Sequence, residues 1–63
     1  NEGYYLKELH GYVAVYLSDG ETLYELTEIS CSSLPKEVQE AVRIGKYVET
    51  TRELYGFLEN YSS

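Results

Sequence analysis

The stretch YYLKELHGYVAVYLSDG, residues 4–20, decides the fold of this 63-residue chain. It reads as two strands around the tight turn His10-Gly11, yet both faces of those strands carry large apolar side chains. A glycine in a two-residue turn readily adopts the positive φ angle that a hairpin requires. The pattern therefore predicts antiparallel strands over residues 4–9 and 12–17.

A third strand is predicted over residues 22–29, because Asp19-Gly20 is a second turn signal of the same type. The three strands then form an antiparallel meander with the second strand in the middle. If both turns have two residues, Leu6 and Tyr24 lie on either side of Val15, and Glu8 and Leu26 lie on either side of Val13.

The next segment changes its hydrophobic period and predicts a helix. Ser32 or Ser33 is expected to cap this helix, and Pro35 fits its first turn. Gly45 is placed to end it, because glycine is common directly after the last helical residue.

The end of the chain predicts a second helix. A short extended piece, Lys46-Tyr47-Val48, comes first. Thr50 and Glu53 then have the spacing of a capping box, and an apolar stripe follows them. The expected fold class is α+β: a three-stranded antiparallel meander followed by two α-helices packed on one sheet face. Residues 1–63 are expected to form this single small domain.

The predicted register divides the sheet into two different faces. An aliphatic face suits the helices and carries Tyr4, Leu6, Val13, Val15, Leu17, Tyr24 and Leu26. The opposite face is tyrosine-rich and carries Tyr5, Lys7, Leu9, Tyr12, Ala14, Tyr16, Leu23, Glu25 and Thr27. Two helices cover only one side of a small sheet, so the tyrosine-rich face is expected to stay open. Its candidate interaction residues are Tyr5, Tyr12, Tyr16 and Leu23.

Three interpretations of this open face are compatible with the sequence. In the first, the tyrosines form a cross-strand ladder that stabilises the sheet by about 0.2–1 kcal/mol per pair and remains exposed to solvent. Alternatively, the face binds a protein partner or a second copy of the chain, since tyrosine is a common interface anchor. The third interpretation is docking against another domain of a longer parent chain. The outer strand edges offer a further route, by addition of a strand from a partner.

Charge and hydropathy exclude several classes of partner. The chain has 11 acidic and 5 basic residues, a net charge of −6. Nucleic acids and anionic membrane surfaces bind clustered Lys and Arg, so neither is expected as a partner. The longest apolar run covers residues 12–17, far short of the roughly 20 residues of a membrane span, so no membrane insertion is expected.

Candidate catalytic and metal-binding residues are sparse. Cys31 and His10 are the sole thiol and imidazole, and no third group is indicated that would orient them. Cys31 is better interpreted as a packing residue, with an intermolecular disulfide as the alternative in an oxidising compartment. Asp19 and Glu21 lack the spacing of a calcium loop. We therefore expect no enzyme activity, no cofactor and no metal site.

The order of these residues resembles the C-terminal domain of BofC, the bypass-of-forespore-C protein of spore-forming Firmicutes. The resemblance covers nearly the whole chain, in the segments YYLKELHGYVAVY, LYELTEIS and SLPKEVQEAVRIGKYVETTRELYGFLENYSS. Its most specific residues are Leu34-Pro35, Gly45 before Tyr47-Val48, Glu53-Leu54 and the closing Leu58-Glu59-Asn60-Tyr61. In the family the hairpin turn is often Asn-Gly, where this chain has His10-Gly11.

The resemblance implies a small α+β module of a Gram-positive bacterium, held outside the cytoplasmic membrane by a segment absent from this sequence. BofC is a negative regulator of a secreted signalling protease in the sporulation checkpoint. That role is not transferred to this chain, because the resemblance carries no catalytic motif and a shared fold does not define a function. We expect a non-catalytic interaction or regulatory module, and the alternative is a purely structural spacer in a membrane-tethered protein.

Overall fold

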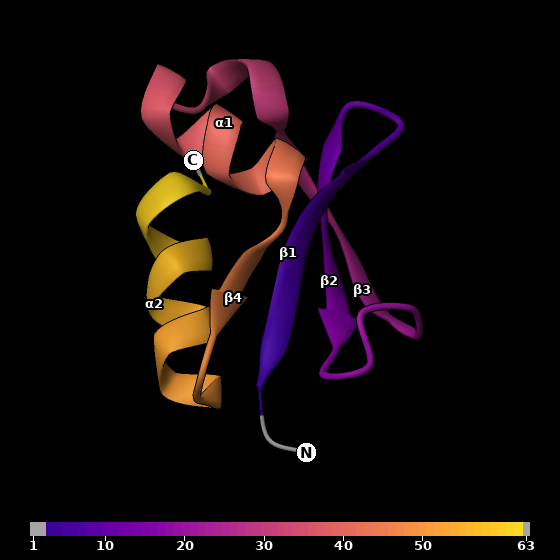
Figure 1. The fold of residues 1–63 in the computed structure, drawn as a ribbon. Coiled ribbons are helices and arrows are strands. Elements are labelled where there is room, and N and C mark those ends of the chain that lie inside the picture. The colour runs from indigo at the N-terminus through magenta and orange to yellow at the C-terminus, as the bar shows by residue number, and fades with distance from the viewer. Residues whose placement is uncertain (1–2, 63) are drawn as a thin grey trace.

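The computed structural model, which describes residues 3–62, shows a four-stranded antiparallel sheet with two α-helices. Figure 1 shows strands β1 (Tyr4–Leu9), β2 (Tyr12–Leu17), β3 (Leu23–Ser30) and β4 (Lys46–Val48), with helices α1 (Lys36–Ile44) and α2 (Thr51–Tyr61). A short 3₁₀ helix, η1 (Cys31–Ser33), joins β3 to α1. The predicted α+β class is confirmed.

The sheet has the order β3-β2-β1-β4, so the prediction of a three-stranded sheet is wrong in that detail. The piece expected to be merely extended, β4, pairs with the first half of β1 and places Tyr5 across from Tyr47. This pairing moves β1 from an edge of the sheet to an inner position. The two outer strands are therefore β3 and β4.

The β1–β2 hairpin has the predicted turn and register. His10 and Gly11 have φ angles of 54° and 85°, the two positive values expected of a type I′ turn. Leu6 lies across from Val15 and Glu8 across from Val13, as expected. His10 is the one non-glycine residue with a positive φ among residues 3–62.

The β2–β3 pair departs from the predicted register. Tyr16 lies across from Leu23, as a two-residue turn would place it, but a bulge follows and puts Glu25 across from Val15. The expected partner of Val15 was Tyr24, so that prediction is wrong. A bulge sets two residues of one strand against one of its neighbour and shifts the register beyond it.

A second irregularity in β3 depends on a side chain. The hydroxyl of Thr27 donates to the carbonyl oxygen of Val13, 2.8 Å away, and accepts a hydrogen bond from the backbone N–H of Ile29 at 3.1 Å. Because the Thr27 side chain forms hydrogen bonds with a backbone carbonyl and a backbone N–H, regular strand pairing is interrupted here. Leu26, which lies before this irregularity, is across from Ala14 and not from Val13 as predicted, because of the first bulge.

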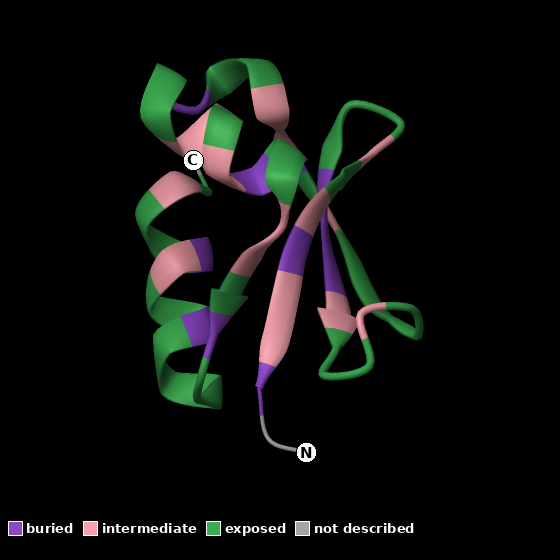
Figure 2. Ribbon diagram, viewed as in Figure 1, coloured by how far each residue is buried: buried purple, intermediate pink, exposed green. Residues whose placement is uncertain are grey.

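The hydrophobic core lies between the sheet and both helices, which cover the same sheet face (Figure 2). Its buried members are Leu6, Val13, Val15, Ile29, Leu34, Val42, Val48, Leu54 and Leu58. Of the other residues assigned to the aliphatic face, Tyr4 packs half-buried against this core, whereas Leu17, Tyr24 and Leu26 are exposed. The central prediction, that Leu6, Val13 and Val15 face the helices, is confirmed.

The two helices begin in different ways. Pro35 occupies the cap position of α1 without a side-chain hydrogen bond, so the predicted caps Ser32 and Ser33 are wrong. The hydroxyl of Ser33 instead donates to the carbonyl oxygen of Ser30, 2.7 Å away, within the η1 segment. Gly45 ends α1 with a φ of 117°, as expected of a terminating glycine.

The capping box of α2 is confirmed in part. The hydroxyl of Thr50 accepts a hydrogen bond from the backbone N–H of Glu53 at 3.0 Å. The Glu53 carboxylate reaches back to the N–H of Glu49 at 3.1 Å, one residue before the N–H that a capping box uses. Both bonds satisfy backbone donors near the start of the helix.

Candidate interaction surface

The four predicted interaction residues share the sheet face that the helices leave open. Cross-strand partners point to the same side of a sheet. The pairings Tyr5 with Tyr16, and Tyr16 with Leu23, therefore place these three residues in one row, and Tyr12 lies four residues before Tyr16 on the same side of β2. We define the tyrosine face by six residues: Tyr5, Tyr12, Tyr16, Leu23, Leu26 and Tyr47.

Two of these six residues were not predicted as members. Tyr47 joins the row because β4 pairs with β1, and Leu26 joins because of the bulges in β3. Both depend on pairing that the sequence pattern did not show. Glu25 was expected on this face, but it lies across from Val15 and so belongs to the helix side.

Exposure is uneven over the tyrosine face. Tyr12, Leu23, Leu26 and Tyr47 expose 44%, 47%, 46% and 47% of their surfaces, whereas Tyr5 and Tyr16 are half-buried. Ala14, which was expected on the open face, is fully buried because the longer side chains of its cross-strand partners, Lys7 and Leu26, flank it. The exposed apolar side chains of the tyrosine face therefore surround the buried Ala14.

The rings of Tyr5 and Tyr47 pack together at the β4 end of the face. Their centroids lie 5.1 Å apart and their planes are inclined by 53°. The ring of Tyr47 also lies directly against Gly3, where a Cβ atom would overlap it. A glycine at this position thus leaves room for the tyrosine ring, which strengthens the short β1–β4 pair.

Lys7 lies on the same side, between the β2–β3 loop and the end of α1. Its ammonium group donates to the carbonyl oxygen of Gly20 at 2.9 Å and lies 5.3 Å from the centroid of the Tyr16 ring. Among the described cross-strand partners on this side, Lys7 is the one charged residue. The acidic residues that dominate the composition are absent from these paired rows.

A shallow hollow of about 390 Å³ extends the tyrosine face towards α1. Tyr5 and Lys7 line it from the sheet, residues 18–21 from the β2–β3 loop, and Ile44 and Gly45 from the end of α1. Ile44 is 77% exposed, the highest value of any large apolar residue in the described chain. The hollow between the sheet and Ile44 also contains Lys7, Asp19 and Glu21, so its lining is mixed polar and apolar.

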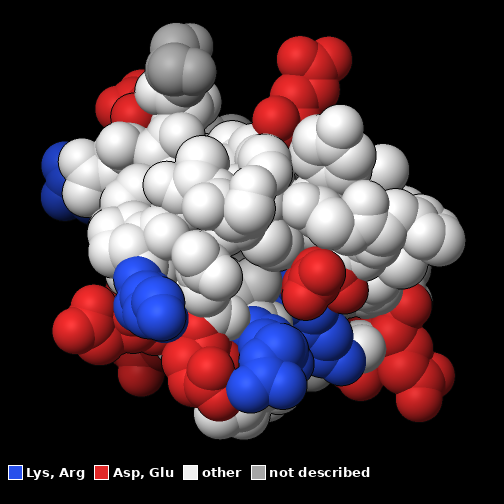
Figure 3. Space-filling model, turned by 90° about the horizontal axis from the view of Figure 1, so that it is seen from above, with Lys and Arg blue, Asp and Glu red and all other residues white. Residues whose placement is uncertain are grey.

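Charged side chains are interleaved on the part of the surface seen in Figure 3. Basic residues lie directly beside acidic ones in that view, and uncharged residues fill its middle. On the exposed side of α1, Arg43 and Glu40 are joined by an ion pair at 2.6 Å. The basic residues in this view are thus neighbours of carboxylates and do not form one continuous positive patch.

Cys31 and His10 lie near the same end of the sheet. The N–H of Cys31 donates to the carbonyl oxygen of Gly11 at 2.9 Å, which places η1 beside the hairpin turn that contains His10. Burial raises the pKa of the Cys31 thiol, and the nearby Glu8 carboxylate raises it further. Both effects favour the protonated thiol, which is the poorer nucleophile.

The Asp19 carboxylate serves the β2–β3 loop. It accepts hydrogen bonds from the backbone N–H groups of Glu21 and Thr22 at 2.8 and 2.9 Å, and from the Thr22 hydroxyl at 2.6 Å. These bonds lower the pKa of Asp19 to about 2, the Thr22 hydroxyl having the largest effect. Within residues 3–62, no three His, Cys, Asp or Glu residues are grouped so that they could hold a metal ion.

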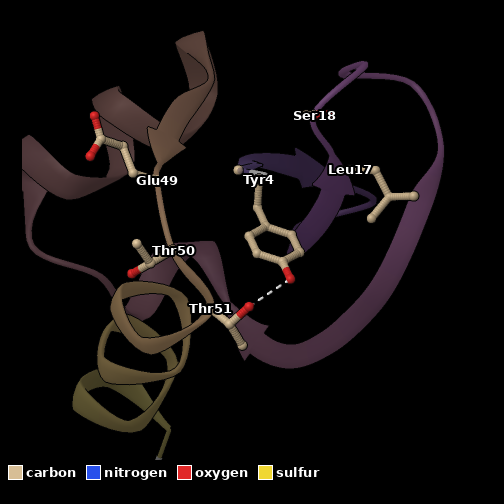
Figure 4. A pocket seen from close by; sticks show the side chains of 7 residues that line it. Tyr4, Leu17, Ser18, Glu49, Thr50 and Thr51 are labelled. Atoms are coloured by element: carbon tan, nitrogen blue, oxygen red, sulfur yellow. Dashed lines mark hydrogen bonds between the residues drawn. The ribbon is translucent and has the colours of Figure 1, made fainter. Parts of the chain in front are cut away.

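A second hollow lies where β1 meets the start of α2. Figure 4 shows Tyr4 pointing from β1 to α2, where its hydroxyl forms a 2.9 Å hydrogen bond with the Thr51 hydroxyl. The remaining lining residues are Gly3, Leu17, Ser18, Glu49 and Thr50, around a space of about 390 Å³. The Tyr4–Thr51 contact connects the sheet to α2.

Comparison with known proteins gives no further identification. The chain matches no protein-family model, and neither a curated protein nor a solved structure matches it. The resemblance to the BofC C-terminal domain therefore stays a prediction made from the residue pattern. No helix within residues 3–62 is long and apolar enough to cross a membrane.

Proposed function

We propose that this chain is a non-catalytic protein-interaction module that associates with a second copy of itself through the tyrosine face. The observation that carries the proposal is the exposed apolar surface of Tyr12, Leu23, Leu26 and Tyr47 on one sheet face. Large amphipathic aromatic residues are typical anchors of protein interfaces.

Charge distribution favours a second copy as the occupant. A chain with a net charge of −6 repels itself wherever two acidic surfaces meet. The paired rows of the tyrosine face carry no carboxylate, and their one charged residue, Lys7, is bonded to Gly20. The paired rows of two such faces meet without opposing carboxylates, and the acidic residues Asp19 and Glu21 lie beside them in the β2–β3 loop.

The setting is part of the same proposal. By its resemblance to the BofC C-terminal domain, the module belongs outside the cytoplasmic membrane of a Gram-positive bacterium, with a regulatory role. The half-buried Tyr5 and Tyr16, with the Tyr5–Tyr47 ring contact, support a second candidate, a structural spacer whose tyrosines only stabilise the sheet.

The two candidates are separated by the solution mass of the protein over a concentration series under reducing conditions. We expect a dimer at high concentration that Tyr12→Ser weakens without unfolding the protein. Tyr55→Ser is the matched control, because Tyr55 is similarly exposed, at 41%, but lies on α2. A monomer at every concentration would contradict self-association and leave the spacer. Equal weakening by both variants would place the interface elsewhere.

A further inference from the structure

A groove with a volume of about 730 Å³ lies between the outer strand β3 and helix α2. Residues 25–30 of β3 form one wall, and Tyr55, Leu58, Glu59, Tyr61 and Ser62 form the other, with Ser33 at one end. In Figure 1 the helices gather beside β4, and β3 lies at the far edge of the sheet.

The floor of this groove is apolar. Ile29 and Leu58 belong to the core and expose 7% and 8% of their surfaces, and both line the groove. Tyr55 and Tyr61 stand along the α2 wall, where they combine an apolar ring with a polar tip. A ligand side chain that enters the groove therefore contacts the edge of the core itself.

One wall is fixed by a chain of contacts that begins at the start of α2. Tyr4 is hydrogen-bonded to Thr51, and its ring lies 5.4 Å from the ring of Tyr24, centroid to centroid. Tyr24 in turn acts on Tyr55 and is the main cause that raises the pKa of the Tyr55 hydroxyl, with a smaller contribution from Glu25. A wall held in this way loses little side-chain entropy when a ligand binds.

The rim of the groove is acidic. Glu25 and Glu28 lie on the β3 wall and Glu59 on the α2 wall, and the lining contains no Lys, Arg or His. An apolar floor between carboxylates fits a cationic ligand that also has an apolar side chain. The same charge disfavours a second copy of this chain, with its net charge of −6, and it disfavours nucleic acid.

The bulges of β3 determine how such a ligand is held. The Thr27 hydroxyl already takes up the N–H of Ile29 and the carbonyl of Val13, so regular addition of a strand is interrupted in the middle of the wall. Recognition must therefore come mainly from side chains in the groove. The six β3 residues of the wall span roughly 20 Å, at about 3.3 Å per residue, the length of an extended hexapeptide.

We propose that the β3–α2 groove binds an extended basic segment of a partner protein. Its apolar side chain packs on Ile29 and Leu58 beside Tyr55, and its flanking Lys or Arg side chains pair with Glu28 and Glu59. This groove shares Leu26 with the tyrosine face, but none of the other five residues of that face lines it. It therefore does not depend on self-association.

The test is a titration with the labelled hexapeptide KVKLKS at low salt, followed by fluorescence anisotropy and by amide chemical shifts of the full chain. We expect saturable binding with shifts concentrated in residues 25–30 and 55–62. Peptides EVELES, of opposite charge, and KSKSKS, without the apolar side chains, are expected to bind at least about tenfold more weakly. No saturable binding of KVKLKS would overturn the proposal.

Variants of the protein localise the binding. The double variant Glu28→Gln with Glu59→Gln is expected to lower the affinity about tenfold, since two rim charges are lost. Glu37→Gln is the matched control, an exposed carboxylate on α1 that does not line the groove. Equal losses of peptide affinity in the double variant and in Glu37→Gln would show that the peptide is attracted to the acidic protein in general. That result would contradict binding in the groove. Tyr12→Ser, which removes a residue of the tyrosine face, is expected to bind the peptide with unchanged affinity. The peptide titration therefore tests the groove whether or not the chain forms a dimer.

Discussion

The ammonium group of Lys7 donates a hydrogen bond to the carbonyl oxygen of Gly20, 2.9 Å away, and so ties β1 to the loop between β2 and β3. The same group lies over the ring of Tyr16. Lys7→Met keeps most of the aliphatic stem and removes the charge. We expect a loss of about 1–2 kcal/mol in the free energy of unfolding, from a charged hydrogen bond and a cation–π contact that are both partly solvated.

Urea denaturation measures this loss, and Lys36→Met is its control, because Lys36 is an exposed residue at the start of α1. The control is expected to change the free energy of unfolding by less than about 0.5 kcal/mol. Equal effects of the two substitutions would show that the contact with Gly20 contributes nothing specific.

The hairpin turn contains a residue in an unfavourable conformation. His10 has a φ of 54°, and the left-handed region is costly for most side chains but is tolerated by asparagine. His10→Asn is therefore expected to stabilise the protein by roughly 0.5–1 kcal/mol. A rise in the midpoint of chemical denaturation checks this expectation, whereas His10→Val is expected to lower it. If asparagine were no better than histidine, the positive φ would not be a source of strain.

The start of α2 depends on one side-chain cap. Thr50→Ala removes the acceptor for the N–H of Glu53 and is expected to cost about 1 kcal/mol of stability. Thr50→Ser keeps the hydroxyl and is expected to stay close to the parent protein. Thermal unfolding followed by circular dichroism compares the three proteins. A serine variant as unstable as the alanine variant would point to the lost methyl group, not to the cap.

The β2–β3 loop is expected to respond to acid. The pKa of Asp19 is lowered to about 2 in the folded protein, below its value of about 3.9 in an unfolded chain. The stabilisation from this group is therefore complete above the unfolded-state pKa and is lost as the pH falls through the folded-state pKa. The carboxyl carbon shift of Asp19 is expected to titrate near pH 2, as NMR can measure.

Asp19→Asn provides the control for this pH dependence, because asparagine keeps an oxygen acceptor but does not titrate. Its stability between pH 5 and roughly pH 2 is expected to fall less than that of the parent chain. A carboxyl that titrates near pH 4 would show that the three hydrogen bonds of Asp19 are not maintained in solution.

The parts of the fold that follow from local patterns were predictable. The hairpin register depends on Gly11 and on the residues next to it, and the ends of the helices depend on Gly45, Thr50 and Glu53. The strand β4 was missed because three residues contain no readable period and their pairing with β1 is distant in the sequence. The caps proposed at Ser32 and Ser33 failed because serines also favour short turns, here η1.

The candidate surface was predictable to a similar extent. Tyr5, Tyr12, Tyr16 and Leu23 were placed on one face because alternation along a strand is simple to count. Leu26 was assigned to the wrong face, since the register shift between the Tyr16 and Val15 pairs that moves it has no periodic signature. The β3–α2 groove depends on where α2 packs relative to β3, and no local pattern in the sequence encodes that distance.

The inner position of β1 has a consequence for the order in which the chain folds during synthesis. The β1–β2 hairpin involves near neighbours and forms as soon as residues 4–17 have left the ribosome. One side of β1 nevertheless stays unpaired until residues 46–48 emerge, since these form its second neighbour. The nascent sheet thus leaves one edge of β1 unpaired until residues 46–48 emerge, and α2 follows only after that edge has been closed.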